Sequence, residues 1–279
     1  MKQHLHEALW AGLGFLLALS APALAADKPG EVLQLFNGKD LTNFYTYLGP
    51  PAQGEKPLGK NHDPDKVFTV KDGQLRISGQ AFGGLVTQKE YGNYHLIVEY
   101  AWGQDTWPPR KDRARNSGIL LHCTGAEGEV EDYWMKSIEC QVLEGATGDL
   151  LLVGGKTKPS LTVTAVPQVV GEGNNLHKEY FYKPGAPPVP FITGRINWSG
   201  KDLHWKDVKG FRGQEDAEVP VGEWNRLECI CDGPQITILL NGKTVNAGTQ
   251  CSLTRGKIMI ESEGAEIFLR RIELQLLKK

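Results

Sequence analysis

Three side chains with reactive or hydrogen-bonding groups are brought together by the pattern of residues 116–144. Residues 116–123 and 137–144 have the alternation of short strands, and the polar stretch 124–136 lies between them. Alternate side chains of an extended chain point to opposite faces, so pairing of the two strands as a hairpin would assemble one polar face. Its members are His122, Glu139 and Gln141. We expect this rigid surface, with an imidazole, a carboxylate and an amide, to carry chemistry or to bind a sugar.

The apolar side chains of the same two strands are expected on the opposite face, packed into a core. They are Ile119, Leu121, Cys123, Ile138, Cys140 and Val142. Antiparallel sheets often keep one polar face that has no function, so each polar residue alone is weak evidence. The three together, next to the Asn116-Ser117-Gly118 turn and the aromatic Trp134, favour a functional site.

The chain begins with the features of a secretory signal over residues 1–26. Lys2 precedes an apolar run over residues 8–19, and Ala23-Leu24-Ala25 has the small residues of a cleavage site. The run is too short for a permanent transmembrane helix, and no second run of the sequence reaches that length. We therefore expect an exported protein, periplasmic or extracellular, in which residues 27–279 form a single domain without a transmembrane segment.

Composition indicates a β-rich domain that does not bind nucleic acid. The net charge is −2 with a pI near 6.4, and the sequence has no basic stripe or arginine cluster. The 33 Gly and 16 Pro residues, with alternating apolar runs and turn signals between them, are typical of short strands and turns. The run from Trp224 to Leu277 shows this most clearly and fits a β-sandwich.

Residues 171–220 are the least regular part of the chain and are rich in Pro, Gly and aromatic side chains. A long irregular stretch inside a compact domain is usually functional or disordered, and the many aromatic residues argue against disorder. Trp198 and Trp205 allow two interpretations. Either their rings wall a carbohydrate site by stacking on the C–H faces of a sugar, or they close one end of a sheet.

Six short motifs, weak singly but strong in their number and order, carry a resemblance to one family. They are Leu35-Phe36-Asn37-Gly38-Lys39-Asp40-Leu41, Asn116-Ser117-Gly118-Ile119, Glu139-Cys140-Gln141-Val142-Leu143, Gly222-Glu223-Trp224-Asn225, Leu240-Asn241-Gly242-Lys243 and Gly264-Ala265-Glu266-Ile267-Phe268-Leu269-Arg270-Arg271-Ile272. Over nearly all of residues 31–277 the chain resembles the exported 3-keto-disaccharide hydrolases, also described as 3-keto-glucoside 1,2-lyases and 3-keto-2-hydroxy-glucal hydratases. The resemblance implies an all-β, concanavalin-like jelly-roll sandwich of two antiparallel sheets, with a sugar site on the concave face.

The resemblance also implies a glycoside or oligosaccharide substrate in its 3-keto form. A ketone at C3 acidifies the C2–H bond, so that a base removes this proton, the C1–O bond breaks by β-elimination, and water adds to the resulting glucal. His122, whose ordinary pKa lies near neutral, and Glu139 are the candidate catalytic residues. A divalent cation on the ketone and enolate oxygens would stabilise charge, and the same two residues are its candidate ligands. The candidate substrate-binding residues are Asn116, Gln141, Trp134, Lys136, Glu261 and Glu263.

Two other functions stay open on the sequence. A two-carboxylate glycoside hydrolase that retains configuration needs carboxyl groups about 5 Å apart. Glu139 and Glu144 point to opposite faces of a regular strand and lie roughly 16 Å apart along it, so this function needs Glu261 or Glu263 to complete the pair across the sheet. A non-catalytic carbohydrate-binding module predicts an aromatic platform without buried titratable groups, which His122 beside Glu139 disfavours.

Overall fold

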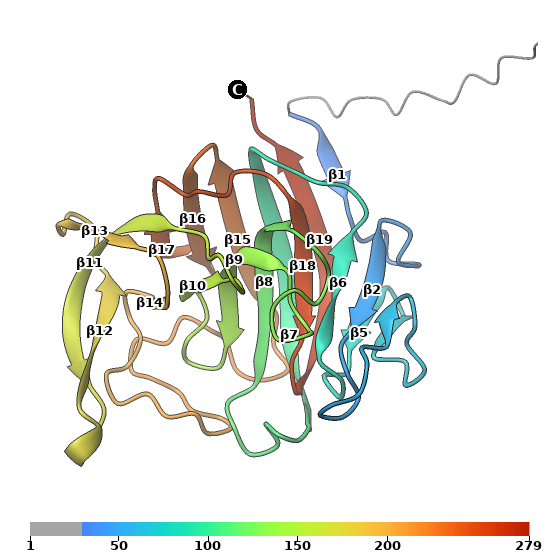
Figure 1. Ribbon diagram of the computed structural model, residues 1–279, viewed down its shortest axis with the longest axis horizontal. Helices are drawn as coiled ribbons and strands as arrows, with labels where there is room; N and C mark the ends of the chain where they lie inside the picture. Colours follow the sequence, from blue (N-terminus) through green and yellow to red (C-terminus); the bar gives the residue numbers. More distant parts are fainter. Residues whose placement is uncertain (1–29, 279) are drawn as a thin grey trace, which may run out of the picture.

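The computed structural model describes residues 30–278, so the predicted signal over residues 1–26 lies outside the described part. This part of the chain forms two β-sheets that pack face to face (Figure 1). No helix among the described residues has the length and apolar character needed to cross a membrane. The predicted all-β jelly-roll sandwich of two antiparallel sheets is confirmed.

The first sheet has eight strands, hydrogen-bonded in the order β17-β16-β15-β7-β19-β5-β4, with β1 beside β19. Their bounds are β1 Val32–Gln34, β4 Phe68–Lys71, β5 Gln74–Ile77, β7 Tyr94–Thr106, β15 Asn225–Asp232, β16 Gln235–Leu240, β17 Lys243–Gly248 and β19 Ala265–Leu276. Turn residues predicted from the sequence, such as Asn241-Gly242, join neighbouring strands of this sheet. The sheet supplies one wall of the core.

The second sheet has eleven strands in the order β13-β11-β12-β14-β10-β9-β8-β18-β6-β2-β3, and within it β12 pairs with β14 in parallel. Their bounds are β2 Phe44–Leu48, β3 Gly59–Lys60, β6 Gly83–Thr87, β8 Asn116–Thr124, β9 Lys136–Leu143, β10 Leu150–Val153, β11 Leu161–Val170, β12 His177–Tyr182, β13 Pro188–Phe191, β14 Arg195–Asn197 and β18 Lys257–Ser262. A 3₁₀ turn at Gly173–Asn175 lies between β11 and β12.

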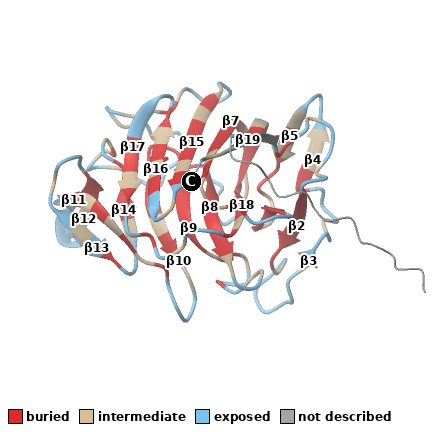
Figure 2. Ribbon diagram, turned by 90° about the horizontal axis from the view of Figure 1, so that it is seen from above, coloured by how far each residue is buried: buried red, intermediate tan, exposed pale blue. Residues whose placement is uncertain are grey.

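The main core lies between the two sheets, and the middle strands of both sheets are therefore the most buried (Figure 2). The alternation along β7 explains how one strand serves both core and surface. Its inward side chains are Tyr94, Leu96, Val98, Tyr100 and Trp102. The side chains between them point away from the core, where His95 contacts Glu228 and Glu99 pairs with Arg270.

The predicted hairpin is present as β8 and β9, and its register determines the outer face of the eleven-stranded sheet, which is the face turned away from the core. Leu120 lies opposite Glu139, and Gly118 lies opposite Gln141. Ile138, Cys140 and Val142 belong to the core cluster between the sheets. Because side chains alternate, Glu139 and Gln141 point to the outer face, as predicted.

At the end of β8 a bulge changes which residues share a face. The prediction that His122 lies on the polar face and Cys123 in the core is therefore wrong. The register against β9 shifts after Leu121, and His122 has a φ of 55°, in the left-handed region. A bulge sets two residues of one strand against one of its partner and so breaks strict alternation. His122 therefore packs its ring edge-on against Tyr94, a core residue, whereas Cys123 joins the apolar cluster on the outer face.

The connection between β8 and β9, residues 125–135, folds back over the outer face of the sheet at its β2 and β6 end. Its apolar side chains pack on residues of β2, β6, β8 and β18 in a second buried cluster, whose members are Tyr45, Val86, Leu120, Cys123, Val130, Trp134, Met135 and Met259. The Tyr45 hydroxyl donates a hydrogen bond to Glu127 of the connection over 2.6 Å. The outer face is thus covered at this end, and a cavity remains over β9, β10, β14 and β12.

Candidate active site

The cavity on the outer face has a volume of about 760 Å³ and is lined by residues of β9, β10, β12 and their neighbouring strands and by the loops around them. Six of the predicted site residues line it, namely Asn116, Trp134, Glu139, Gln141, Glu261 and Glu263. Two do not: His122 lies in the core, and Lys136 donates a hydrogen bond to the Thr157 hydroxyl over 2.9 Å. The other six predicted residues thus share one cavity.

Strand register places an acidic and a basic residue on either side of the cavity floor. Leu151 of β10 lies opposite Glu139 of β9 on one side and opposite Arg195 of β14 on the other. All three side chains line the cavity. Strands are spaced about 4.8 Å apart, so the Cα atoms of Glu139 and Arg195 are separated by roughly 10 Å with an apolar side chain between them.

Three carboxylates form the acidic side of the cavity. A Cβ atom at Gly118 would lie closer than 3.0 Å to a carboxylate oxygen of both Glu139 and Glu261, so these two groups converge over the glycine from β9 and β18. Glu263 follows directly after β18 and lies beside Asn116 and Glu261. Only a residue without a side chain at position 118 leaves room for the two carboxylates to approach each other.

Burial raises the pKa of all three carboxyl groups above the ordinary value of a glutamate. Burial, together with the nearby charge of Glu263, raises the pKa of Glu139 to about 8. Burial likewise raises the pKa of Glu263 to about 7. The pKa of Glu261 is raised well above its usual range by burial and by the charge of Glu139. A carboxyl group with a pKa near the working pH is suited to proton transfer.

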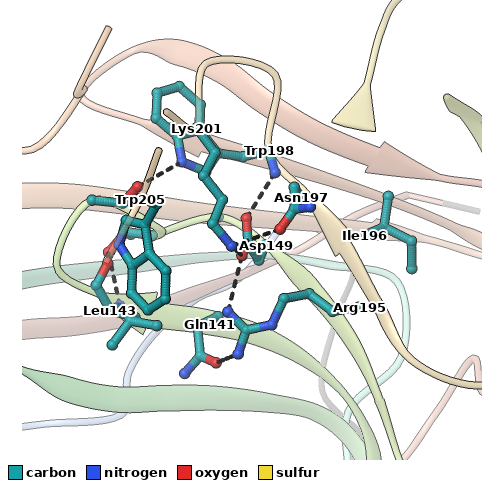
Figure 3. Close-up of polar contacts among 12 residues, drawn as sticks. Gln141, Leu143, Asp149, Arg195, Ile196, Asn197, Trp198, Lys201 and Trp205 are labelled. Atoms are coloured by element: carbon teal, nitrogen blue, oxygen red, sulfur yellow. Dashed lines mark hydrogen bonds and ion pairs between the residues drawn. The ribbon is translucent and has the colours of Figure 1, made fainter. Parts of the chain in front are cut away.

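The basic side of the cavity is built on the buried carboxylate of Asp149, which is 0% exposed. Arg195 donates one hydrogen bond to Asp149 over 3.1 Å and another to the Gln141 side-chain oxygen over 2.8 Å (Figure 3). Lys201 donates to Asp149 over 3.0 Å, and the Trp198 backbone N–H donates over 2.7 Å. The guanidinium group of Arg195 is thereby fixed in orientation while it still lines the cavity.

The series of hydrogen bonds continues from Lys201 toward β12. Lys201 donates a hydrogen bond to Asn197 over 2.6 Å, and Asn197 donates to Glu179 over 2.6 Å. The Lys201 ammonium lies 4.9 Å from the centre of the Trp205 ring, whose N–H donates to the Glu144 backbone oxygen over 2.9 Å (Figure 3). Lys201, Glu179 and Trp205 all line the cavity.

The two interpretations of the tryptophans each hold for one residue. Trp205 lines the cavity, which fits an aromatic wall for a sugar. Trp198 is 1% exposed and belongs to the core cluster, so it closes the sandwich instead. Sequence alone did not separate the two because both rings occur in the same irregular segment.

The predicted pair of metal ligands does not fit the structure. His122 has its Nδ1 atom 3.0 Å from the Leu253 backbone oxygen, its Nε2 atom has no partner among the described residues, and burial lowers its pKa to about 4. It lies on the core face of the sheet, whereas Glu139 points to the outer face, so one ion cannot contact both. Among residues 30–278 no group of three His, Cys, Asp or Glu side chains is arranged to hold a metal ion.

The family model of the 3-keto-alpha-glucoside-1,2-lyase-like domain matches residues 31–275. The chain belongs to this family. This match confirms the family predicted from the six motifs. By the description of that family, this lyase-like domain is a carbohydrate-active protein. No curated protein sequence matches the chain.

Solved structures similar to this lyase-like domain are distant from it. A candidate glycosyl hydrolase from Parabacteroides distasonis has 20% sequence identity and a TM-score of 0.48, with 88% of this chain and 100% of that chain covered. A β-glucanase from Bacillus licheniformis has 12% identity and a TM-score of 0.41, covering 91% and 100%. The carbohydrate-binding module CBM66 from Bacillus subtilis has 10% identity and a TM-score of 0.38, covering 74% and 89%. Likeness at this level does not bear on the chemistry of the cavity.

The basic side of the cavity in this lyase-like domain was not predicted from the sequence. No sequence spacing links Glu139 to Arg195, Asp149 and Lys201. These three residues come from β14, a turn and a loop, which meet only in the folded sheet. The Asp149 turn follows β9 directly, and the Gly148 N–H donates to the Gln141 backbone oxygen over 2.9 Å. The one signal in the sequence is an acidic residue in the glycine-containing turn directly after the motif strand.

Proposed function

We propose that this domain cleaves 3-keto-glycosides by removing the C2 proton, eliminating the aglycone and adding water to the glucal. The observation that carries the proposal is the placement of Glu139 and Arg195 on the two sides of Leu151 in one cavity. A base and a fixed cation on opposite sides of an apolar floor are what the removal of a proton next to a ketone requires.

Glu139 acts as the base in this proposal. Its pKa of about 8, raised by burial, gives the carboxylate more proton affinity than an exposed glutamate has. Proton transfer of this kind typically contributes about 10²- to 10⁴-fold to a rate. After water has added to C1, the protonated Glu139 returns its proton to C2 and the base is restored.

Arg195 stabilises the negative charge that develops on the C3 oxygen. Asp149 and Gln141 hold its guanidinium in place before the reaction, so no reorganisation is needed when the enolate forms. Removing one such fixed donor typically costs about 10²- to 10³-fold in rate. Gln141 itself donates to Asn116 over 2.8 Å, which fixes its amide and so the orientation of Arg195.

The approach of two carboxylates favours a second candidate, a two-carboxylate glycosidase that retains configuration. Glu139 and Glu261 meet over Gly118, which supplies the pair across the sheet that such an enzyme needs. That mechanism needs one ionised and one protonated carboxyl group, as the elimination does, so the raised pKa values of the pair do not separate the two candidates. Family membership favours the 3-keto substrate over the plain glycoside.

A turnover assay of the purified chain separates the two candidates. The substrates are a 3-keto-glucoside and the matching unoxidised glucoside, each offered with and without a chelator. We expect cleavage of the keto sugar alone. Cleavage of the plain glucoside at a similar rate would instead support two-carboxylate hydrolysis. Loss of cleavage on chelation, restored by one added divalent cation, would support the metal ion that the family resemblance implied.

A further inference from the structure

Glu261 is the most enclosed carboxyl group of the cavity. It lies on β18, it is 2% exposed, and its Oε2 atom has no hydrogen-bond partner among the described residues. An unpartnered buried polar atom costs free energy, so its presence calls for an explanation. The cavity that Glu261 lines is where a ligand group would reach this atom.

The surroundings of Glu261 favour its protonated form. Glu263 lies beside it, and Glu139 faces it across Gly118. The cations nearby already have partners, since Arg110 pairs with Asp207 over 2.9 Å and Arg195 with Asp149 over 3.1 Å. Carboxyl groups that share a buried site cannot all ionise, so at least one keeps its proton. Burial and the charge of Glu139 raise the pKa of Glu261 well above its usual range.

We propose that Glu261 is the catalytic acid of this cavity, which gives its proton to the aglycone oxygen as the C1–O bond breaks. The inference rests on the proposed function and assigns the proton source that elimination needs. Glu139 and Glu261 then form a pair with opposite roles: one carboxylate takes a proton and the neighbouring carboxylic acid gives one. Gly118 is a positioning residue, because it is the absence of its side chain that lets the two groups converge.

The proton and electron balance closes over one turnover. Glu139 takes the C2 proton, and the electrons of that bond form the enolate on the C3 oxygen. The carbonyl then re-forms, a C1–C2 double bond forms, and the C1–O electrons leave with the aglycone oxygen, which takes the proton of Glu261. In hydration, water adds to C1 and gives a proton to the Glu261 carboxylate, while Glu139 returns its proton to C2. Both groups end as they began.

The variant Glu261→Gln tests the assignment with two substrates that differ only in the aglycone. A methyl 3-keto-glucoside needs a proton for its leaving group, whereas a 4-nitrophenyl 3-keto-glucoside does not. We expect Glu261→Gln to lower kcat/KM about 10²- to 10³-fold for the methyl substrate and to leave the nitrophenyl substrate within a few-fold of the wild type. An equal loss with both aglycones would overturn the proposal.

A matched control and a measurement on the wild type keep the test decisive. Glu228→Gln changes a carboxylate of the eight-stranded sheet that contacts His95, not the cavity, and should leave both rates unchanged. In the wild type, the methyl substrate should lose rate at alkaline pH as the acid ionises, and the nitrophenyl substrate should not. The same alkaline loss with both substrates would overturn the inference, even if Glu261→Gln does not fold. A wild-type protein that cleaves neither keto sugar would overturn the proposed function as well.

Discussion

Glu139→Gln is expected to lower kcat/KM for a 3-keto-glucoside by about 10²- to 10⁴-fold, with either aglycone. The substitution keeps the shape of a side chain that is 5% exposed and removes only its ability to take a proton. Loss with both aglycones sets this variant apart from Glu261→Gln, because removal of the C2 proton precedes departure of any leaving group. Steady-state rates, with circular dichroism to show that the fold is kept, are the measurement.

The pH dependence of the wild type follows from the same residue. The active form of the base is the carboxylate, so kcat/KM should rise with pH through the Glu139 pKa of about 8. The groups that face Glu139 and shape this rise are Glu261, Glu263, Arg195 and Asp149. In Glu139→Gln the residual rate should no longer show the rise. A variant that keeps full activity with an unchanged pH profile would remove Glu139 from the mechanism.

Asp149→Asn is expected to lower the free energy of unfolding by about 3–5 kcal/mol, the usual cost of removing one partner from a buried ion pair. Asp149 is 0% exposed and accepts hydrogen bonds from Lys201, Arg195 and the Trp198 backbone. Without its negative charge, the buried ammonium group of Lys201 is left uncompensated. Urea denaturation of both proteins, with the m-value checked for constancy, measures the difference.

A second substitution tests this physical cause. Lys201→Met in the Asp149→Asn background removes the uncompensated charge while it keeps an apolar stem, so part of the lost stability should return. The control is Lys201→Met alone, which leaves Asp149 paired with Arg195 over 3.1 Å. A cost for Asp149→Asn below about 1 kcal/mol, typical of an exposed pair, would show that the pair is not held in a buried network.

The sequence could predict the sheet that carries the site because alternation and turn residues are local signals. The β8–β9 hairpin, the outer-face position of Glu139 and Gln141, and the two-sheet fold all follow from such patterns. His122 shows the limit of this reasoning. One left-handed residue at the bulge turned its ring into the core, and strict period-two alternation holds no sign of a bulge.

The other half of the cavity depends on contacts between distant parts of the chain. Arg195 shares the cavity with Glu139 only because β10 pairs with both β9 and β14. Lys201 reaches Asp149 across 52 positions of sequence. Glu261 was predicted as a site residue, but its meeting with Glu139 over Gly118 required the register of β18 beside β8. Register between strands far apart in sequence is set by the whole sheet, not by any one segment.

The most direct test of C2-proton removal compares a 3-keto-glucoside that carries hydrogen at C2 with one that carries deuterium there. Both are offered together to the wild-type protein, and their consumption is followed by mass spectrometry. Removal of the C2 proton in the rate-limiting part of the reaction predicts that the hydrogen form is consumed faster. Equal consumption of both forms would contradict removal of the C2 proton in the rate-limiting part of the reaction. The label left in the released keto sugar does not decide the test, because Glu139 returns to C2 the proton that it took.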